Sequence, residues 1–490
     1  MYNKCIMNTR VKVRKTEDQI EAEIAERERK QFDKMTKTPI ARLVIGLGIP
    51  TMLNMMVTSL YNLADTYFVT GLGQQATGAV NVVLSLMSII QAIGFTFGMG
   101  SGSIVSKLLG ARKREEADQV ASTAFFTAGA IGTLILVLGM LFLSPLMKLL
   151  GAPSESGVEI TTLAYAKEYS TYILIAAPFM CMSFVLNNVL RAEGKAVLSM
   201  AGLVSGAVIN VVLDPILIYG ADMGIAGAGI ATCISQIISF GILLTMFLTG
   251  KTVVRMRFRR IARQFTVYFD VIATGFPSFC RQILASLCTV MLNWAVKPYD
   301  GALAALGIVQ KVFMVAFSIS LGIGQGYQPV LGYNHSAKRY DRVRGAYIFT
   351  AIFSMSLMTV FAIACAIFAP QLMQAFNQTE NATKIGALSL RLQCICMPLL
   401  PVNFMISITY QTVGNKGIAS LLSVSRQGLF YIPAVLILPK VAGLIGVQSC
   451  QAVSDAFSFL FALPFTYLFF KSLKKLETES ADSVEKAENE

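Results

Sequence analysis

Residues 61–68 read Tyr-Asn-Leu-Ala-Asp-Thr-Tyr-Phe and lie near the end of the first long apolar run of the chain. Asp65 therefore falls inside a segment that we expect to be a membrane-buried helix. Placing an aspartate at the centre of a bilayer costs roughly 2.5–3.5 kcal/mol, so such a residue usually faces a cavity or a partner. Asp65 is the first candidate for a functional site, and the rest of the chain can be examined for its partners.

The composition is that of a membrane protein. Of the 490 residues, 54% are hydrophobic and only 14% are charged, whereas a soluble protein carries about 25% charged residues. Residues 120–147 and 197–213 contain no charge, and about 20 apolar residues cross a bilayer as a helix. We predict an all-α polytopic membrane protein with twelve transmembrane helices.

The net charge of +13 does not indicate nucleic-acid binding, because the basic residues lie between the predicted spans and in the tails. Loops on one side hold most of them, and the other side holds only Lys148, Lys297, Lys384 and Lys440. This asymmetry predicts a cell-membrane protein with both termini cytoplasmic. The scattered cysteines read as small apolar residues, and the single histidine, His335, excludes a multi-histidine metal site.

The two halves of the sequence repeat. An offset of 226 residues sets Gly100 on Gly326, and an offset of 219 sets Gly224 on Gly443. Six spans in each half give both repeats the same orientation, and such repeats place a substrate path between two lobes that rock for alternating access. The predicted parts are a charged cytoplasmic tail (1–38), an amino-terminal six-helix lobe (39–250), a basic cytoplasmic linker (251–265), a carboxy-terminal six-helix lobe (266–471) and a second cytoplasmic tail (472–490).

Several polar residues of the first lobe are predicted to meet at one depth. Asn210 and Asp214 are four apart and share a helix face, as do Tyr61 and Asp65. At 1.5 Å per residue, both aspartates lie about 8–9 Å below the outer rim, and Thr232 lies at about 12 Å. Such oxygen donors suit a hard cation, and two close carboxylates could instead share a proton. The alternative is that each aspartate only bonds to a helix end.

A substrate path is expected to have polar, aromatic and methionine side chains along it. Flexible methionine suits promiscuous binding, and aromatic faces attract lipophilic cations. A methionine at helical spacing is equally typical of simple packing, so both interpretations stay open. The predicted lining residues are Tyr61, Asn62, Met56, Gln91, Asn187, Asn188, Tyr327 and Gln328.

The chain resembles the multidrug and toxic compound extrusion (MATE) transporters. The stretches that carry the resemblance are 60–66, 109–112, 190–194, 209–216, 224–232 and 324–334. The resemblance implies a V-shaped exporter of two six-helix lobes, driven by a Na⁺ or H⁺ gradient. It also implies a cation site at Asp65, Asn210, Asp214 and Thr232, and a bending proline at Pro50.

The carboxy-terminal lobe departs from some branches of that family. Its first span has Arg281 and no deep acid, and its second span has Lys311. Asp455 in the last span is expected to pair with Lys311 or Arg426. We interpret these charges as structural, because buried ions need partners, which favours coupling from the amino-terminal lobe.

We therefore expect an antiporter that exports cationic amphiphilic drugs or toxic compounds in exchange for H⁺ or Na⁺. The alternative is a flippase for a lipid-linked saccharide, which would need a strongly cationic cavity. We do not expect an enzyme: an intramembrane prenyltransferase would need paired aspartate motifs, and Asp65 and Asp214 are isolated. The expected partners are small amphiphiles and the lipid bilayer, with no nucleic acid, and we expect a monomer with no cofactor beyond the coupling ion.

Overall fold

The computed structural model describes residues 17–152, 162–299, 301–376 and 380–488, and within them every regular element is a helix. The side chains of residues 62–67, among them Asn62 and Asp65, lie outside the description. The helices are α1 (Glu17–Lys37), α2 (Ile40–Thr70), α3 (Gln74–Gly110), α4 (Arg114–Leu141), α5 (Leu143–Leu149), α6 (Thr162–Ala192), α7 (Ala196–Pro215), η1 (Ile216–Gly220), α8 (Gly224–Leu248), η2 (Phe258–Arg260), α9 (Phe265–Val296), α10 (Ala302–Ser336), α11 (Tyr340–Ile367), α12 (Ala369–Gln374), α13 (Glu380–Cys396), η3 (Met397–Leu399), α14 (Leu400–Val413), α15 (Lys416–Val424), η4 (Ser425–Tyr431) and α16 (Ile432–Glu488).

The predicted membrane spans are present as long apolar helices. Eleven helices of the described residues are long and apolar enough to cross a bilayer. The last of these runs from Lys416 to Glu479 and holds the eleventh and twelfth predicted spans, which meet at a sharp turn where Gly443 has φ 57° and ψ −134°. Large apolar side chains such as Leu141, Trp294 and Val441 are more than two-thirds exposed on the outer surface. An apolar surface of this kind suits a lipid environment.

The backbone repeats between the halves at the positions that the sequence offsets predict. Gly194 and Gly414 both have positive φ, at 74° and 106°, and so do Gly224 and Gly443. Even the non-glycine Arg112, at 59°, has a counterpart in Lys338, at 55°. Positive φ is uncommon for a residue with a side chain, so its recurrence 226 residues later is evidence of a duplicated fold.

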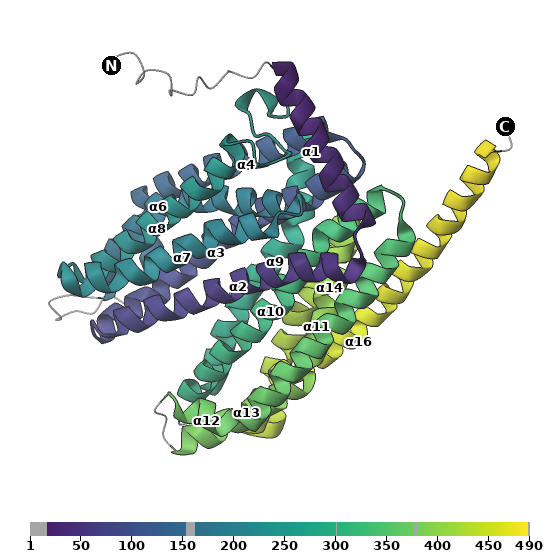
Figure 1. Cartoon of the computed structure of the whole chain (residues 1–490). Helices are drawn as coiled ribbons and strands as arrows, with labels where there is room; N and C mark the ends of the chain where they lie inside the picture. Colours follow the sequence, from purple (N-terminus) through teal and green to yellow (C-terminus); the bar gives the residue numbers. More distant parts are fainter. Residues whose placement is uncertain (1–16, 153–161, 300, 377–379, 489–490) are drawn as a thin grey trace, which may run out of the picture.

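The helices form two lobes that touch near one end and diverge away from it (Figure 1). The α1 face is our name for the end that carries α1 and the loops at 111–113, 193–195, 251–264, 337–339 and 414–415. The lobes pack through α2 on α10 and α3 on α9. A Cβ atom on Gly326 would lie 2.5 Å from the Gly48 Cα, and one on Gly275 would lie 1.8 Å from the Thr96 carbonyl oxygen. These backbones therefore approach closely only because glycine occupies both positions.

Pro50, the predicted bending position, lies inside α2 between two of these close approaches. Gly48 faces Gly326 on one side, and the Met52 Cα lies 2.4 Å from where a Gly322 Cβ would be. A proline inside a helix removes one backbone hydrogen bond. The Thr51 hydroxyl donates to the Leu47 carbonyl at 2.7 Å, which gives the weakened turn an additional contact.

Helix α1 is docked on the protein, although its charge predicted a solvated tail. Met35 is fully buried, and its carbonyl accepts a hydrogen bond from the Asn334 amide at 3.1 Å. The Arg112 guanidinium lies 4.4 Å from the centre of the Phe32 ring. Because Arg112 ends α3 and Asn334 lies in α10, α1 contacts both lobes on the α1 face.

The basic segment 251–264 is also tied to the amino-terminal lobe. The Glu193 carboxylate accepts hydrogen bonds from the backbone amides of Val253 and Val254, at 3.0 and 2.8 Å. Asp118 accepts from the Arg255 amide at 2.8 Å and forms an ion pair with Arg260. Two buried carboxylates therefore fix the path of this segment.

Candidate cation site in the amino-terminal lobe

The site is built on two adjacent helices, α7 and α8. The Asn210 amide nitrogen donates to the Asp214 carboxylate at 3.2 Å and to the Thr232 hydroxyl at 3.3 Å. All three side chains are almost completely buried, with Asp214 at 0% exposure. The helices can approach because Gly206 has no side chain: a Cβ there would lie 2.8 Å from the Ser239 Cβ. The structure thus brings together three of the four predicted cation-site residues.

Asp214 stands at an irregular point of its helix. Pro215 follows it, and the next five residues form the π-helical turn η1. Proline lacks the amide hydrogen that would continue the α-helical ladder, and π-helical turns are frequent at functional sites. The Tyr219 hydroxyl at the end of this turn donates to the Phe68 carbonyl of α2 at 2.6 Å. This bond joins the two helices that carry Asp214 and Asp65.

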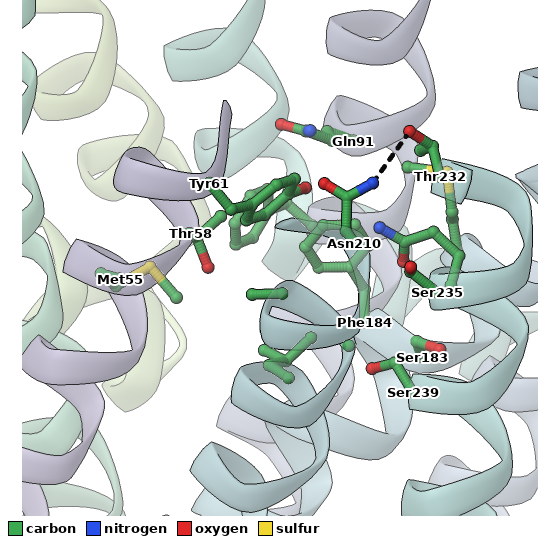
Figure 2. A pocket seen from close by; sticks show the side chains of 16 residues that line it. Met55, Thr58, Tyr61, Gln91, Ser183, Phe184, Asn210, Thr232, Ser235 and Ser239 are labelled. Carbon is green, nitrogen blue, oxygen red and sulfur yellow. Dashed lines mark hydrogen bonds between the residues drawn. The ribbon is translucent and has the colours of Figure 1, made fainter. Parts of the chain in front are cut away.

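A cavity of about 70 Å³ lies beside these residues (Figure 2). A single water molecule needs roughly 10–15 Å³ of such volume, so the cavity has room for several waters or a partly hydrated ion. Drug-sized pockets occupy about 300–1,000 Å³, which excludes a drug from this cavity in this conformation. The lining residues are Met55, Thr58, Tyr61, Gln91, Phe95, Met180, Ser183, Phe184, Leu203, Gly206, Ala207, Asn210, Thr232, Ser235, Gln236 and Ser239.

The electrostatics of the site favour a cation. Among the described residues, no lysine, arginine or histidine lines the cavity. The carbonyl oxygen of the Asn210 side chain is buried and has no hydrogen-bond donor. An unsatisfied buried acceptor costs about 1–3 kcal/mol, and a bound cation would satisfy it. Carboxylate, amide and hydroxyl oxygens are the donors that hard cations prefer.

Asp65 lies in α2, but its side chain is outside the described residues, as is that of Asn62. The predicted approach of Asp65 to Asp214 therefore stays a prediction. Tyr61, one turn before Asp65 on the same helix, lines the cavity and is labelled in Figure 2.

The predicted substrate-lining residues fall into two groups. Tyr61 and Gln91 line the cavity. The other described ones lie in helix–helix interfaces, because polar side chains there find partners on neighbouring helices: Met56 packs on the core of the carboxy-terminal lobe, Asn187 bonds to Ser199, Asn188 accepts from Arg191, Tyr327 lies near the Thr409 hydroxyl and Gln328 bonds to Ser103.

Sequence reasoning missed three hydroxyls that line the cavity: Ser183, Ser235 and Ser239. Two of them had a signal. Thr232, Ser235 and Ser239 are spaced three and four residues apart on α8, which places them on one helix face. Ser183 had no such pattern, because its face of α6 can be assigned only from packing.

In the other lobe, Asp455 pairs with Arg426, the second of its two expected partners. Their side chains are 2.7 Å apart and almost fully buried. Lys311 is exposed on α10. This acid is therefore already neutralised, unlike the oxygen-lined cavity of the first lobe.

These features define a membrane transporter built from two related lobes. The MatE family model matches residues 50–216 and 277–437. The chain therefore belongs to the MatE family of efflux transporters, as its motifs predicted.

Two curated relatives extend over most of the chain. The multidrug export protein MepA of Staphylococcus saprophyticus is 24% identical over 437 residues, which are 88% of this chain and 94% of the relative. The protein of the same name from Staphylococcus aureus is 25% identical over 438 residues, with the same coverage.

Solved structures show the same fold. A crystal structure of MATE in complex with MaL6 is 25% identical and covers 90% of this chain and 99% of its own, with a TM-score of 0.84. An outward-facing conformation of a multidrug resistance MATE family transporter has a TM-score of 0.85 at 24% identity, covering 90% of this chain and 98% of its own. The second likeness concerns the fold alone.

Proposed function

We propose that this protein is a multidrug exporter coupled to H⁺ or Na⁺ through the amino-terminal lobe. The observation that carries the proposal is the buried group of Asp214, Asn210 and Thr232 beside a cavity lined by no basic side chain. The names of the relatives support multidrug export. The proposed substrates are cationic or amphiphilic small molecules.

The cation would enter from the end of the molecule opposite the α1 face. The basic loops of the α1 face support a cytoplasmic position for it in the cell membrane, since such loops stay on the inside. The cation would bind the carboxylate of Asp214 with the free carbonyl oxygen of Asn210 and the hydroxyl of Thr232, and Asp65 would complete the site.

Ion binding would act on the drug through helix α2. This helix carries Tyr61 at the cavity and Pro50 at the contact with α10. A movement of α2 at its weakened turn would therefore change both the cavity and the interface between the lobes. The drug would bind between the lobes and leave as they rock. One charge crossing 100 mV supplies roughly 2.3 kcal/mol, enough to bias such an exchange.

The test is gradient-driven efflux of a fluorescent cationic dye from membrane vesicles. We expect Asp214→Asn and Asp65→Asn each to abolish efflux driven by a Na⁺ or pH gradient. Asp222→Asn is the matched control, because Asp222 is exposed and lies eight residues after Asp214. Undiminished efflux in both buried variants would overturn the site, and the gradient that drives the wild type names the ion.

A further inference from the structure

The carboxy-terminal lobe contains a counterpart of the cation-site cavity. An offset of 220 residues relates Ser183 to Asn403 and Phe184 to Phe404. Each member of both pairs lines a cavity in its own lobe. The two cavities therefore occupy equivalent places in the duplicated fold.

Two substitutions reverse the charge of this place. The same offset relates Gly206 of the first cavity to Arg426, and an offset of 219 relates Gln236 to Asp455. Where the amino-terminal lobe has a glycine and a neutral amide, the carboxy-terminal lobe has a buried ion pair. The guanidinium occupies space that is open in the first lobe, which explains why the second cavity measures about 10 Å³ against about 70 Å³.

Arg281 adds a second positive charge to this cavity. It comes from α9, is 7% exposed and donates to the Ser278 hydroxyl at 3.2 Å. It forms no ion pair with any described side chain, and its Nη1 atom is buried without an acceptor. The Arg281 and Arg426 guanidinium carbons each lie 5.8 Å from the centre of the Phe404 ring. The two cations therefore flank one aromatic ring.

The charges of this cluster do not balance. Asp455 neutralises one of the two arginines, and the Nη2 atom of Arg426 also lacks an acceptor. A buried, unpaired charge is strongly unfavourable, and a buried donor without an acceptor costs about 1–3 kcal/mol. One small anion between the arginines would neutralise the excess charge and accept from both free nitrogens.

We propose that Arg281 and Arg426 bind one small monovalent anion, such as chloride, in the carboxy-terminal lobe. The volume of about 10 Å³ is close to the minimum for one water-sized particle. This volume fits a monatomic ion and excludes a diphosphate, the group that a saccharide-lipid flippase would bind. The side-chain amides of Asn403 and Gln427 also line the cavity, and each could turn an N–H toward the anion, because amide orientation is assigned from bonding.

The experiment compares the thermal stability of the purified full-length protein in sodium chloride, sodium bromide and sodium gluconate at equal concentration. Holding Na⁺ constant keeps any cation effect the same in all three. We expect the Tm to rise by about 3 °C from gluconate to chloride or bromide, saturating with concentration, since a ligand that binds only the folded state stabilises it. Arg281→Gln should remove this rise and leave the Tm in gluconate unchanged or higher, which a merely structural arginine would not do.

Lys311→Gln is the control for a general charge effect, because Lys311 is an exposed cation of the same lobe; this variant should keep the rise. Crystals of the wild type in bromide give a second readout, with anomalous signal expected beside the Arg281 guanidinium. Equal Tm values in chloride and gluconate, or absence of that signal, would show that only water fills the cavity and would overturn the proposal. Neither result bears on Asp214, so the proposed cation coupling is tested separately.

Discussion

The two lobes share one backbone plan but place opposite charges in equivalent cavities. The amino-terminal cavity has Gly206 and Gln236 and is lined by neutral polar and apolar side chains, with Asp214 buried beside it. The carboxy-terminal cavity has Arg426 and Arg281, and its Asp455 is held at 2.7 Å by Arg426. A π-helical turn lies in the fifth span of each lobe, η1 after Asp214 and η4 around Arg426.

This difference separates two uses of a buried carboxylate. A carboxylate next to oxygen donors and open volume can exchange ions, whereas one held by an arginine is fixed, because breaking the pair leaves an uncompensated charge. Duplication thus supplied two similar cavities, and a few substitutions gave them different roles. The predictions below test that difference, beginning with the largest effect.

Asp455→Asn should destabilise the protein most, because it leaves Arg426 buried without its acid. Removing one partner of a buried pair costs about 3–5 kcal/mol. The measurement is the Tm of purified protein in sodium gluconate, where no small halide can replace the carboxylate. Asp214→Asn is the comparison variant and should keep the wild-type Tm within a few degrees. Equal losses in both variants would remove the distinction between the lobes.

Replacing the whole pair should be far milder than breaking it. The double variant with Arg426→Met and Asp455→Leu should recover most of the stability lost in Asp455→Asn, since apolar residues often substitute for a buried ion pair without loss. Its dye efflux should still depend on the ion gradient, because the coupling site is in the other lobe. Loss of ion dependence in a stable double variant would count against coupling from one lobe.

Asn210→Ala should weaken ion binding without abolishing it. The variant removes the donor that bridges Asp214 and Thr232 and the free carbonyl oxygen. A hydrogen bond to a charged group is worth about 1.5–3 kcal/mol, so the ion concentration for half-maximal efflux should rise at least tenfold. Asn81→Ala, at an exposed asparagine of the same lobe, should leave that midpoint unchanged. An unchanged midpoint in Asn210→Ala would place the ion elsewhere.

Thr232 gives the smallest and most specific effect. Thr232→Val keeps the shape of the side chain and removes its hydroxyl, so we expect a few-fold higher midpoint, corresponding to about 0.5–1.5 kcal/mol for one neutral hydrogen bond. Thr232→Ser retains the hydroxyl and should remain near the wild type. If Val and Ser behaved alike in the efflux titration, the hydroxyl would have no part in ion binding.

Much of this fold could be predicted from the sequence, because its determinants are local. Charge-free runs located the spans, and glycine offsets such as Gly194 to Gly414 located the repeats before the matching positive φ values were known. Depth counting also placed Asn210, Asp214 and Thr232 at one level, where hydrogen bonds now join them. The MATE family assignment followed from the same stretches.

What could not be predicted depends on helix rotation and long-range docking. Tyr327 and Asn187 looked like lining residues, but packing turns Tyr327 toward Thr409 and Asn187 toward Ser199. Hydropathy does not distinguish a helix face that meets a cavity from one that meets another helix. The burial of Met35 was equally invisible, because its partners are hundreds of residues away.

The docking of α1 has a consequence for how this protein is made. Met35 bonds to Asn334 and Thr38 accepts from Arg342, so the partners of α1 are synthesised about 300 residues after it. Domains generally fold from the amino terminus during synthesis, but this helix cannot settle until the second lobe has entered the membrane. The first helix to be translated is thus among the last to be placed, and its docking marks the assembly of both lobes.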